Sequence, residues 1–283
     1  MDRKTVLSIL NLLDDPDNKV YEEIRDIIVE NFGDFSGEFT KRIYSGECGE
    51  IEKYRIVEAA QLSISRIFLN EFKNYTAKLT PEPSLLTGTV MIEKITDNTF
   101  NAYDFMVQMR NLSRKVWIHL GDNTGYETLV IIKDIFKKEN IIADNNGSSM
   151  LNGIFSRETK TMQKSLVNLL FLIVCQEIGI NVRPIIIPDN NGKKLEIGYV
   201  NMELAKESNI PSKYGAIFAI DDNLQVKRNA KILLGKPLPY YKYLRHWQTD
   251  RCTDMQVEPN RYPRYYSVIM EKINEVLVKN IKY

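Results

Sequence analysis

The chain has 283 residues, of which 43% are hydrophobic and 27% are charged. This is an ordinary globular composition, with enough apolar residues for a sizeable core in one to three domains. The formal net charge of +1 excludes a strong attraction of the whole molecule to nucleic acid or to an acidic surface.

Residues 1–80 are predicted to form a helical domain. Apolar side chains recur at the spacing of one helix face in three stretches, which are 6–13, 20–33 and 56–68. The segment Asp14-Asp15-Pro16-Asp17 ends the first helix and caps the second. This turn resembles the inter-helix turn of a HEAT repeat, with Val20 and Ile56 as equivalent points one repeat apart.

Residues 81–235 are predicted to form a second domain, which follows the linker Thr80-Pro81-Glu82-Pro83. Its apolar patterns predict helices at 85–91, 105–117, 129–136 and 164–178 and strands at 182–188, 195–200 and 216–220. Turns are expected at 145–149 and at 190–192, where Asn-Asn-Gly is typical of a hairpin.

Residues 236–283 form the third predicted segment. Its first part, 236–266, is rich in proline, tyrosine and arginine, and an apolar helix face at 268–277 follows. The predicted fold is therefore of the α+β class, with helices at both ends of the chain and a small antiparallel sheet between them.

Cysteine content and hydropathy predict a cytoplasmic protein. The three cysteines, Cys48, Cys175 and Cys252, are odd in number and far apart, so neither a disulfide framework nor a cysteine-based zinc site is expected. The longest apolar run, 169–175, is far shorter than the ~20 residues of a membrane span. The first apolar stretch is predicted to be a helix rather than a signal peptide. No cofactor, metal or membrane partner is expected.

Charge is spread unevenly along the chain. Residues 1–50 carry 12 acids and 6 bases, whereas residues 227–266 carry 9 bases and 3 acids. Such an asymmetry can steer a partner, or it can let the two ends of one molecule pack together. The second interpretation predicts ion pairs between the acidic N-terminal block and the basic C-terminal segment.

The helix expected at 164–178 ends in Gln176-Glu177-Ile178-Gly179-Ile180 and leads directly into a strand. This succession resembles the transglutaminase-like (papain-like) superfamily, in which a cysteine opens the helix and a histidine and an aspartate follow on the next two strands. The chain is most similar to the bacterial SirB branch, including members with a HEAT-like N-terminus. The resemblance covers residues 85–220, and the segments that carry it are 114–118, 149–157 and 165–188.

The nucleophile that this resemblance implies is missing. The family's cysteine position corresponds to Lys164 or Ser165, and neither is a cysteine. Cys175 lies three turns further along the same helix among apolar neighbours, so it is predicted to be a core residue. A thiol nucleophile also needs a base within about 3 Å and a group that orients this base.

The histidine that the resemblance implies is missing too. Its position reads Asp189 and Asn190, and no histidine occurs between His119 and His246. Asp222 stands in the place of the family's acid, with Asp221 as an alternative, but an acid without its histidine orients nothing. We therefore expect no transglutaminase or cysteine protease activity from this degenerate site, which comprises Lys164, Ser165, Asp189, Asn190 and Asp222.

A second combination of reactive residues lies at 244–252, where His246, Asp250 and Cys252 follow one another closely. Arg251 could lower the pKa of the thiol. However, a spacing of six residues does not bring two side chains together in a helix or a surface loop. A catalytic pair is therefore not expected here.

The C-terminal segment interleaves basic and aromatic residues, a pattern that suits base stacking and phosphate contact. The same residue types are enriched at protein interfaces. The candidate interaction residues are Tyr240, Tyr241, Tyr243, Arg245, Trp247, Arg261 and Arg264. The structural alternative is that the rings pack this tail onto the body while its arginines pair with the acidic N-terminal block.

The resulting hypothesis is a pseudoenzyme, a non-catalytic binding or scaffold module with an unknown protein partner. One alternative is a hydrolase of unknown substrate that uses residues around the degenerate cleft. A second is single-stranded RNA binding by the basic aromatic tail. A pocket that opens at Lys164 or Ser165 would favour the enzyme. If side chains fill the opening of this pocket, the binding module is favoured.

Overall fold

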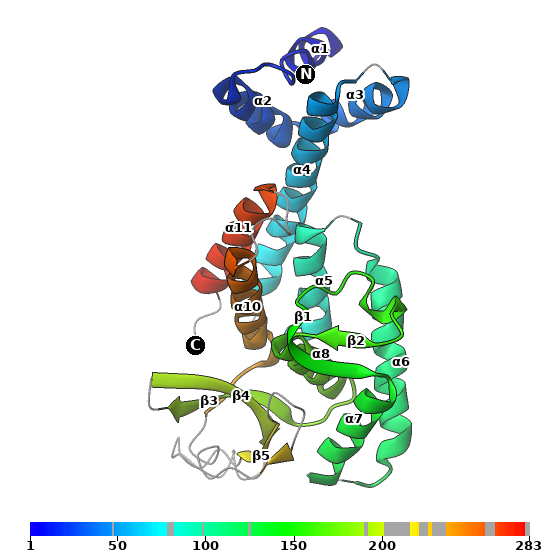
Figure 1. The fold of residues 1–283 in the computed structure, drawn as a ribbon. Helices are drawn as coiled ribbons and strands as arrows, with labels where there is room; N and C mark the ends of the chain where they lie inside the picture. Colours follow the sequence, from blue (N-terminus) through cyan, green and yellow to red (C-terminus); the bar gives the residue numbers. More distant parts are fainter. Residues whose placement is uncertain are drawn as a thin grey trace.

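The computed structural model describes residues 1–46, 48–77, 82–97, 99–123, 126–189, 192–200, 216–220, 226–227, 236–257 and 264–280. Helices dominate this part of the chain and two small sheets accompany them, so the fold is of the α+β class, as predicted. Figure 1 shows the N-terminal helices at one end of the molecule and the larger sheet near the other.

Four helices precede residue 80. They are α1 (Arg3–Leu10), α2 (Asn18–Glu30), α3 (Phe32–Ser45) and α4 (Glu50–Ala77). The aspartate-rich turn acts as predicted, because the Asp17 side chain accepts a hydrogen bond from the Lys19 amide and caps α2. Arg55 of α4 fixes the same turn by donating from Nη1 to the carbonyls of Leu13 and Asp15, both at 2.7 Å.

The apolar core divides within α4. Ile56 and Ala59 pack with α1, α2 and α3, whereas Leu69, Phe72 and Tyr75 belong to the main core. The predicted domain boundary after residue 80 thus falls beyond the point where the core divides. In Figure 1, α4 runs from the N-terminal helices into the body of the molecule.

The body is built on a central helix, α8 (Lys164–Glu177), in which every side chain from Ser165 to Cys175 is buried. A helix that is apolar all round must be covered on every side. The helices that surround it include α5 (Leu85–Thr96), α6 (Ala102–Leu120), α7 (Tyr126–Lys138) and α10 (Tyr243–Val257), and α11 (Arg264–Asn280) packs on α4 and α10. The predicted third segment, 236–283, therefore shares the main core rather than forming a separate unit.

The larger sheet follows α8 directly. Its strands are β3 (Val182–Asp189), β4 (Gly192–Val200), β5 (Ala216–Ile220), β6 (Val226–Lys227) and β7 (Lys236–Pro237), in the antiparallel order β6-β5-β4-β3-β7. The three predicted strands are confirmed. Asp189 pairs with Gly192, which agrees with the predicted hairpin, although residues 190 and 191 lie outside the described part.

The turn predicted at 145–149 is wrong. Residues 145–148 belong to β1 (Ile141–Ser148), which pairs in parallel with β2 (Lys160–Met162) through Ile141, Ile142, Ala143 and Ser148. Between them lies the short helix η1 (Ile154–Ser156), and a similar turn, η4 (Tyr240–Lys242), precedes α10. The strand keeps the polar Asn145 and Asn146 exposed and buries Gly147, so β1 lacks the apolar alternation that identifies a strand in a sequence.

Gly147 permits the close approach of β1 to β2. A Cβ atom at this position would lie 2.3 Å from the carbonyl carbon of Met162 and 2.7 Å from its Cα. Because backbone atoms cannot move aside as a flexible side chain can, we expect Gly147→Ala to lower the free energy of unfolding by about 1–3 kcal/mol. Urea unfolding measures this loss.

Gly37 provides the control for this substitution. It lies inside α3 with no atom within 4 Å of an added Cβ, so Gly37→Ala should raise the free energy of unfolding by about 1 kcal/mol. Equal effects of the two substitutions would contradict the packing described for Gly147.

Among the helices of the described residues, none is both long and apolar enough to cross a lipid bilayer.

Candidate functional site

The start of α8 is the place where the resemblance implies a reactive site. Lys164 is the first residue of α8, and the Ser165 side chain is buried. β1 lies beside this helix start, where the Gln163 amide donates to the Ser148 carbonyl at 2.9 Å. Asp189 lies at the hairpin end of β3, about 23 Å along the strand from its start at the rise of an extended chain. Asn190 and Asp222 lie outside the described residues.

The basic aromatic tail is mostly inside the molecule, which corrects its interpretation as a contact surface. Tyr240, Tyr241, Tyr243 and Trp247 are all buried, and Trp247 is 0% exposed. Arg245 is half-buried on α10. Arg264 is the first residue of α11, and Arg261 lies outside the described part. The rings are buried because they form the face with which η4 and α10 pack on the body.

Tyr240 shows how the tail is held. Its hydroxyl donates to the Ile180 carbonyl at 2.8 Å, and the Arg183 guanidinium lies 4.0 Å from its ring centroid. Arg183 also forms an ion pair with Glu82 at 2.6 Å. Here an aromatic residue of the tail packs against a basic residue of β3, and this contact contributes to packing and stability.

The predicted ion pairs between the two ends of the chain are not seen among the described residues. The described ion pairs of residues 1–46 all lie within the N-terminal helices, for example Arg3 with Glu38 and Arg42 with Glu52. Arg251 of the basic segment pairs instead with Glu93. The described ion pairs of the acidic block are thus local.

Cys252 and His246 do not form a nucleophile and base. Both lie on α10 six residues apart, and His246 instead faces Asp250 at 3.9 Å. Burial raises the pKa of the Cys252 thiol, and neighbouring Arg251 offsets only part of this shift. Burial also raises the pKa of Cys175 well above its usual value. Both residues therefore stay thiols at neutral pH.

This arrangement predicts slow thiol chemistry. In the native protein at pH 7.4, half-buried Cys252 should react slowly with a chromogenic disulfide reagent, and buried Cys48 and Cys175 should react more slowly still. All three thiols should become reactive in 6 M guanidinium chloride. A native thiol that reacts faster than free cysteine would contradict the raised pKa values.

An open surface of the body lies at the other end of α8. Two adjoining hollows occur where α6 passes the turn between α8 and β3, and Trp117 and Ile178 line both of them. The larger has a volume of about 590 Å³ and the smaller about 410 Å³. These volumes are within the range of small-ligand sites. We call the two together the Trp117 groove.

The turn after α8 is held by a Schellman motif. Gly179 has φ +76°, and the Ile180 amide donates to the Cys175 carbonyl at 2.9 Å. The Gly179 amide donates to the Gln176 carbonyl at 3.4 Å. This geometry leaves Ile178, Ile180 and Asn181 beside the larger hollow.

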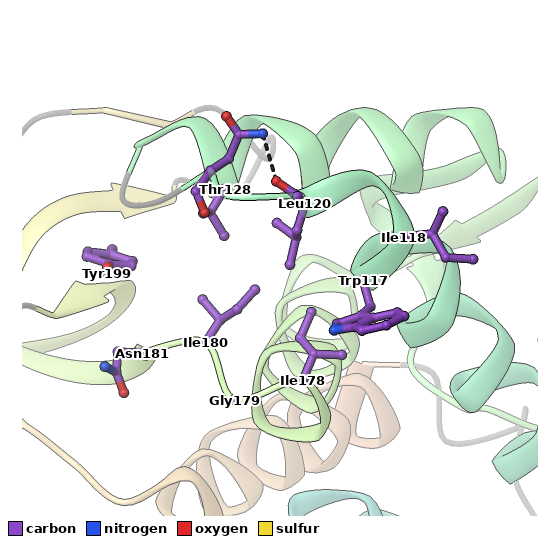
Figure 2. Close-up of a pocket in the computed structure, with 11 residues that line it drawn as sticks. Trp117, Ile118, Leu120, Thr128, Ile178, Gly179, Ile180, Asn181 and Tyr199 are labelled. Carbon is purple, nitrogen blue, oxygen red and sulfur yellow. Dashed lines mark hydrogen bonds between the residues drawn. The ribbon is translucent and has the colours of Figure 1, made fainter.

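The facing wall comes from the end of α6, where Gly121 also has a positive φ of +51°. The Asn123 side chain donates to the Leu120 carbonyl at 2.7 Å, and the Thr128 hydroxyl donates to the Asn123 carbonyl at 3.0 Å. Figure 2 shows Ile180 pointing toward Leu120, with Tyr199 on the opposite side of the hollow from Trp117. Since both helix ends are capped, the walls of the larger hollow carry little unpaired backbone.

Trp117 is the most unusual side chain of this surface. It is 66% exposed, although tryptophan usually buries most of its area. It lies next to Ile118, which is also exposed and lines the larger hollow. The opposite face of α6 packs into the core through Phe105, Met109, Leu112 and Val116.

The smaller hollow is basic. Arg110, Ser113, Arg114 and Trp117 follow the i, i+3, i+4, i+7 spacing of one helix face, and Glu177 of α8 lies across from them. Arg110 and Arg114 are exposed, and neither has an ion-pair partner among the described residues. The Ser113 hydroxyl is buried there without a hydrogen-bond partner in the described structure.

These groove residues are absent from the candidate sites that the sequence indicates. The signal that could have found them is a tryptophan and two arginines on the polar face of an amphipathic helix. Such a pattern is only informative once the hollow beside it is known, because exposed arginines on helices are common.

The groove holds no obvious catalytic constellation, and in the described part of the chain no three histidine, cysteine, aspartate or glutamate side chains are grouped to hold a metal ion. Comparisons of this chain with models of protein families, with curated proteins and with solved structures find no match.

Proposed function

We propose that this protein is a non-catalytic binding module that holds a segment of a partner protein in the Trp117 groove. The observation that carries the proposal is the exposed Trp117 between two adjoining hollows. Tryptophan is among the residues that contribute most to protein interfaces, because its large rigid surface is covered at little cost in entropy.

The elements beneath the groove favour such a role. α6 is anchored through a complete apolar face, and α8 is buried along its length. A site built on rigid helices loses less conformational entropy on binding than one built on loops. Trp117 is therefore presented in a fixed place, while its indole ring is open to a partner.

We also propose that the body is a transglutaminase-like scaffold without its reactive groups, and that α1 to α4 are HEAT-like. α8, β3, β4 and β5 follow one another in the order that the resemblance implies, and Ser165 is buried where a nucleophile would have to be accessible. The turn held by Asp17 and Arg55 supports the HEAT-like interpretation.

A selection experiment tests the binding function. A phage-displayed library of random 12-residue peptides is panned on the immobilised full-length protein, and the enriched peptides are synthesised. Their affinity for the Trp117→Ala variant should fall by about 2 kcal/mol, roughly 30-fold, as expected for a tryptophan hot spot. No enriched peptide, or peptides that bind the variant equally well, would contradict the proposal.

A further inference from the structure

We propose that the segment bound in the Trp117 groove is acidic and carries an apolar side chain next to its carboxylates. This inference rests on the proposed function and specifies the chemistry of the partner. It follows from the two different linings of the groove, which meet at Trp117.

The charge of the smaller hollow favours carboxylates. Arg110 and Arg114 are one turn apart on α6 and have no ion-pair partner in the described part of the chain, whereas Lys115 on the same helix is paired with Glu139 at 2.6 Å. Like charges at this spacing disfavour the isolated helix. An incoming carboxylate would relieve their repulsion, and a guanidinium can bind it with two hydrogen bonds.

The larger hollow favours an apolar side chain. Trp117, Leu120, Ile178 and Ile180 line it, together with uncharged polar groups of Asn123 and Asn181. A leucine, isoleucine or phenylalanine placed there would cover the exposed indole ring and leave no buried charge unpaired.

Nucleic acid fits this surface less well. Glu177 lines the same hollow and repels a carboxylate and a phosphate alike, so the number of charges decides between the two ligands. Two cations neutralise few phosphates, and affinity for nucleic acid rises with the number of phosphates that are neutralised.

The test compares matched double variants on the peptides enriched from the library. Arg110→Ser with Arg114→Ser removes the charge of the smaller hollow. Lys137→Ser with Lys138→Ser removes the same charge from the exposed end of α7. The enriched peptides should be rich in aspartate and glutamate around an apolar residue. Their affinity should fall roughly tenfold in the arginine variant at low salt and stay unchanged in the lysine variant.

Other results overturn the inference in distinguishable ways. Neutral or basic peptides that need Trp117 but not the arginines would overturn the acidic chemistry and leave the binding function intact. Arginine-dependent binding of a labelled 12-nucleotide poly(U) that is tighter than any enriched peptide would assign the groove to nucleic acid. Self-association in sedimentation that the arginine variant abolishes would assign it to a second copy of this chain.

Discussion

Trp247→Ala is expected to lower the free energy of unfolding by about 3–5 kcal/mol, the usual cost of truncating a large buried aromatic side chain. Trp247 is fully buried on α10, and the Arg251 guanidinium lies 4.8 Å from its ring centroid. The substitution leaves a cavity in the core and removes the contact with this cation, and both changes weaken the packing of α10 on the body. Urea unfolding followed by far-ultraviolet circular dichroism measures the loss.

The other tryptophan of the chain is the matched control. Trp117 is exposed and is not a member of the described core clusters, so Trp117→Ala should change the free energy of unfolding by no more than about 0.5 kcal/mol. Equal losses for the two variants would contradict the described burial. The contrast also matters for binding experiments. If the Trp247→Ala variant no longer binds a partner, the cause is unfolding of the protein and not the removal of an interface residue.

The second large effect is expected at the buried pair of Glu93 and Arg251. Arg251 Nη1 lies 3.2 Å from Glu93 Oε1, and these side chains are 2% and 0% exposed. The Leu151 amide also donates to Oε1 at 3.4 Å, whereas Oε2 has no partner among the described residues. Arg251→Met alone should therefore cost about 3–5 kcal/mol at pH 7, because it leaves a carboxylate without its cation in the core.

The loss should depend on pH in a defined direction. Burial raises the pKa of Glu93 above the 4.5 of an unperturbed glutamate, and Arg251 opposes this shift. Without Arg251 the folded-state pKa rises further. Because this pKa is raised, the contribution of the Glu93 carboxyl to stability is fully present below pH 4.5. It is lost as the pH rises toward the folded-state pKa. The cost of Arg251→Met should thus be small at pH 4.5 and large at pH 7.

A double variant distinguishes the effect of removing one charge of the Glu93–Arg251 pair from the effect of removing both charges. Glu93→Leu with Arg251→Met removes both charges and should recover most of the stability that Arg251→Met loses at pH 7. Urea unfolding of the wild type and the two variants at both pH values gives the comparison. A loss from Arg251→Met that is the same at pH 4.5 and pH 7, or that the second substitution fails to recover, would contradict the described ion pair.

The sequence predicts those elements whose signal is local. The apolar run of α8 and the β-branched strand β3 are long and strongly patterned, and their observed bounds differ from the predicted ones by one residue. The hairpin after β3 follows from Asn190-Asn191-Gly192, whose turn chemistry needs no distant partner.

Elements that depend on distant contacts are not found in this way. α3 contains Gly33 and Gly37, which lower helix propensity, yet it forms because Phe35 and Phe39 pack into the N-terminal core. β1 forms a strand only because it pairs with β2. In the C-terminal tail, composition alone cannot distinguish buried aromatic residues from exposed ones. Tertiary packing decides these cases.

The Trp117 groove could not be predicted for the same reason. Its walls come from α6 and from the turn after α8, which lie about sixty residues apart in the sequence and meet only in the fold. The resemblance stated from the sequence directs attention to the start of α8, whereas the Trp117 groove lies at the end of this helix, some 20 Å away at the usual rise per residue.

The most direct test of the binding function is the exposure of Trp117 to acrylamide, a collisional quencher of indole fluorescence. In the free protein, Trp117 should be quenched readily, and the Trp117→Phe variant, which keeps only the buried Trp247, gives the quenching of a shielded ring. At saturation with an enriched peptide, quenching of the wild type should fall to that of the variant. A bound peptide that leaves Trp117 as accessible as before would contradict binding in the groove.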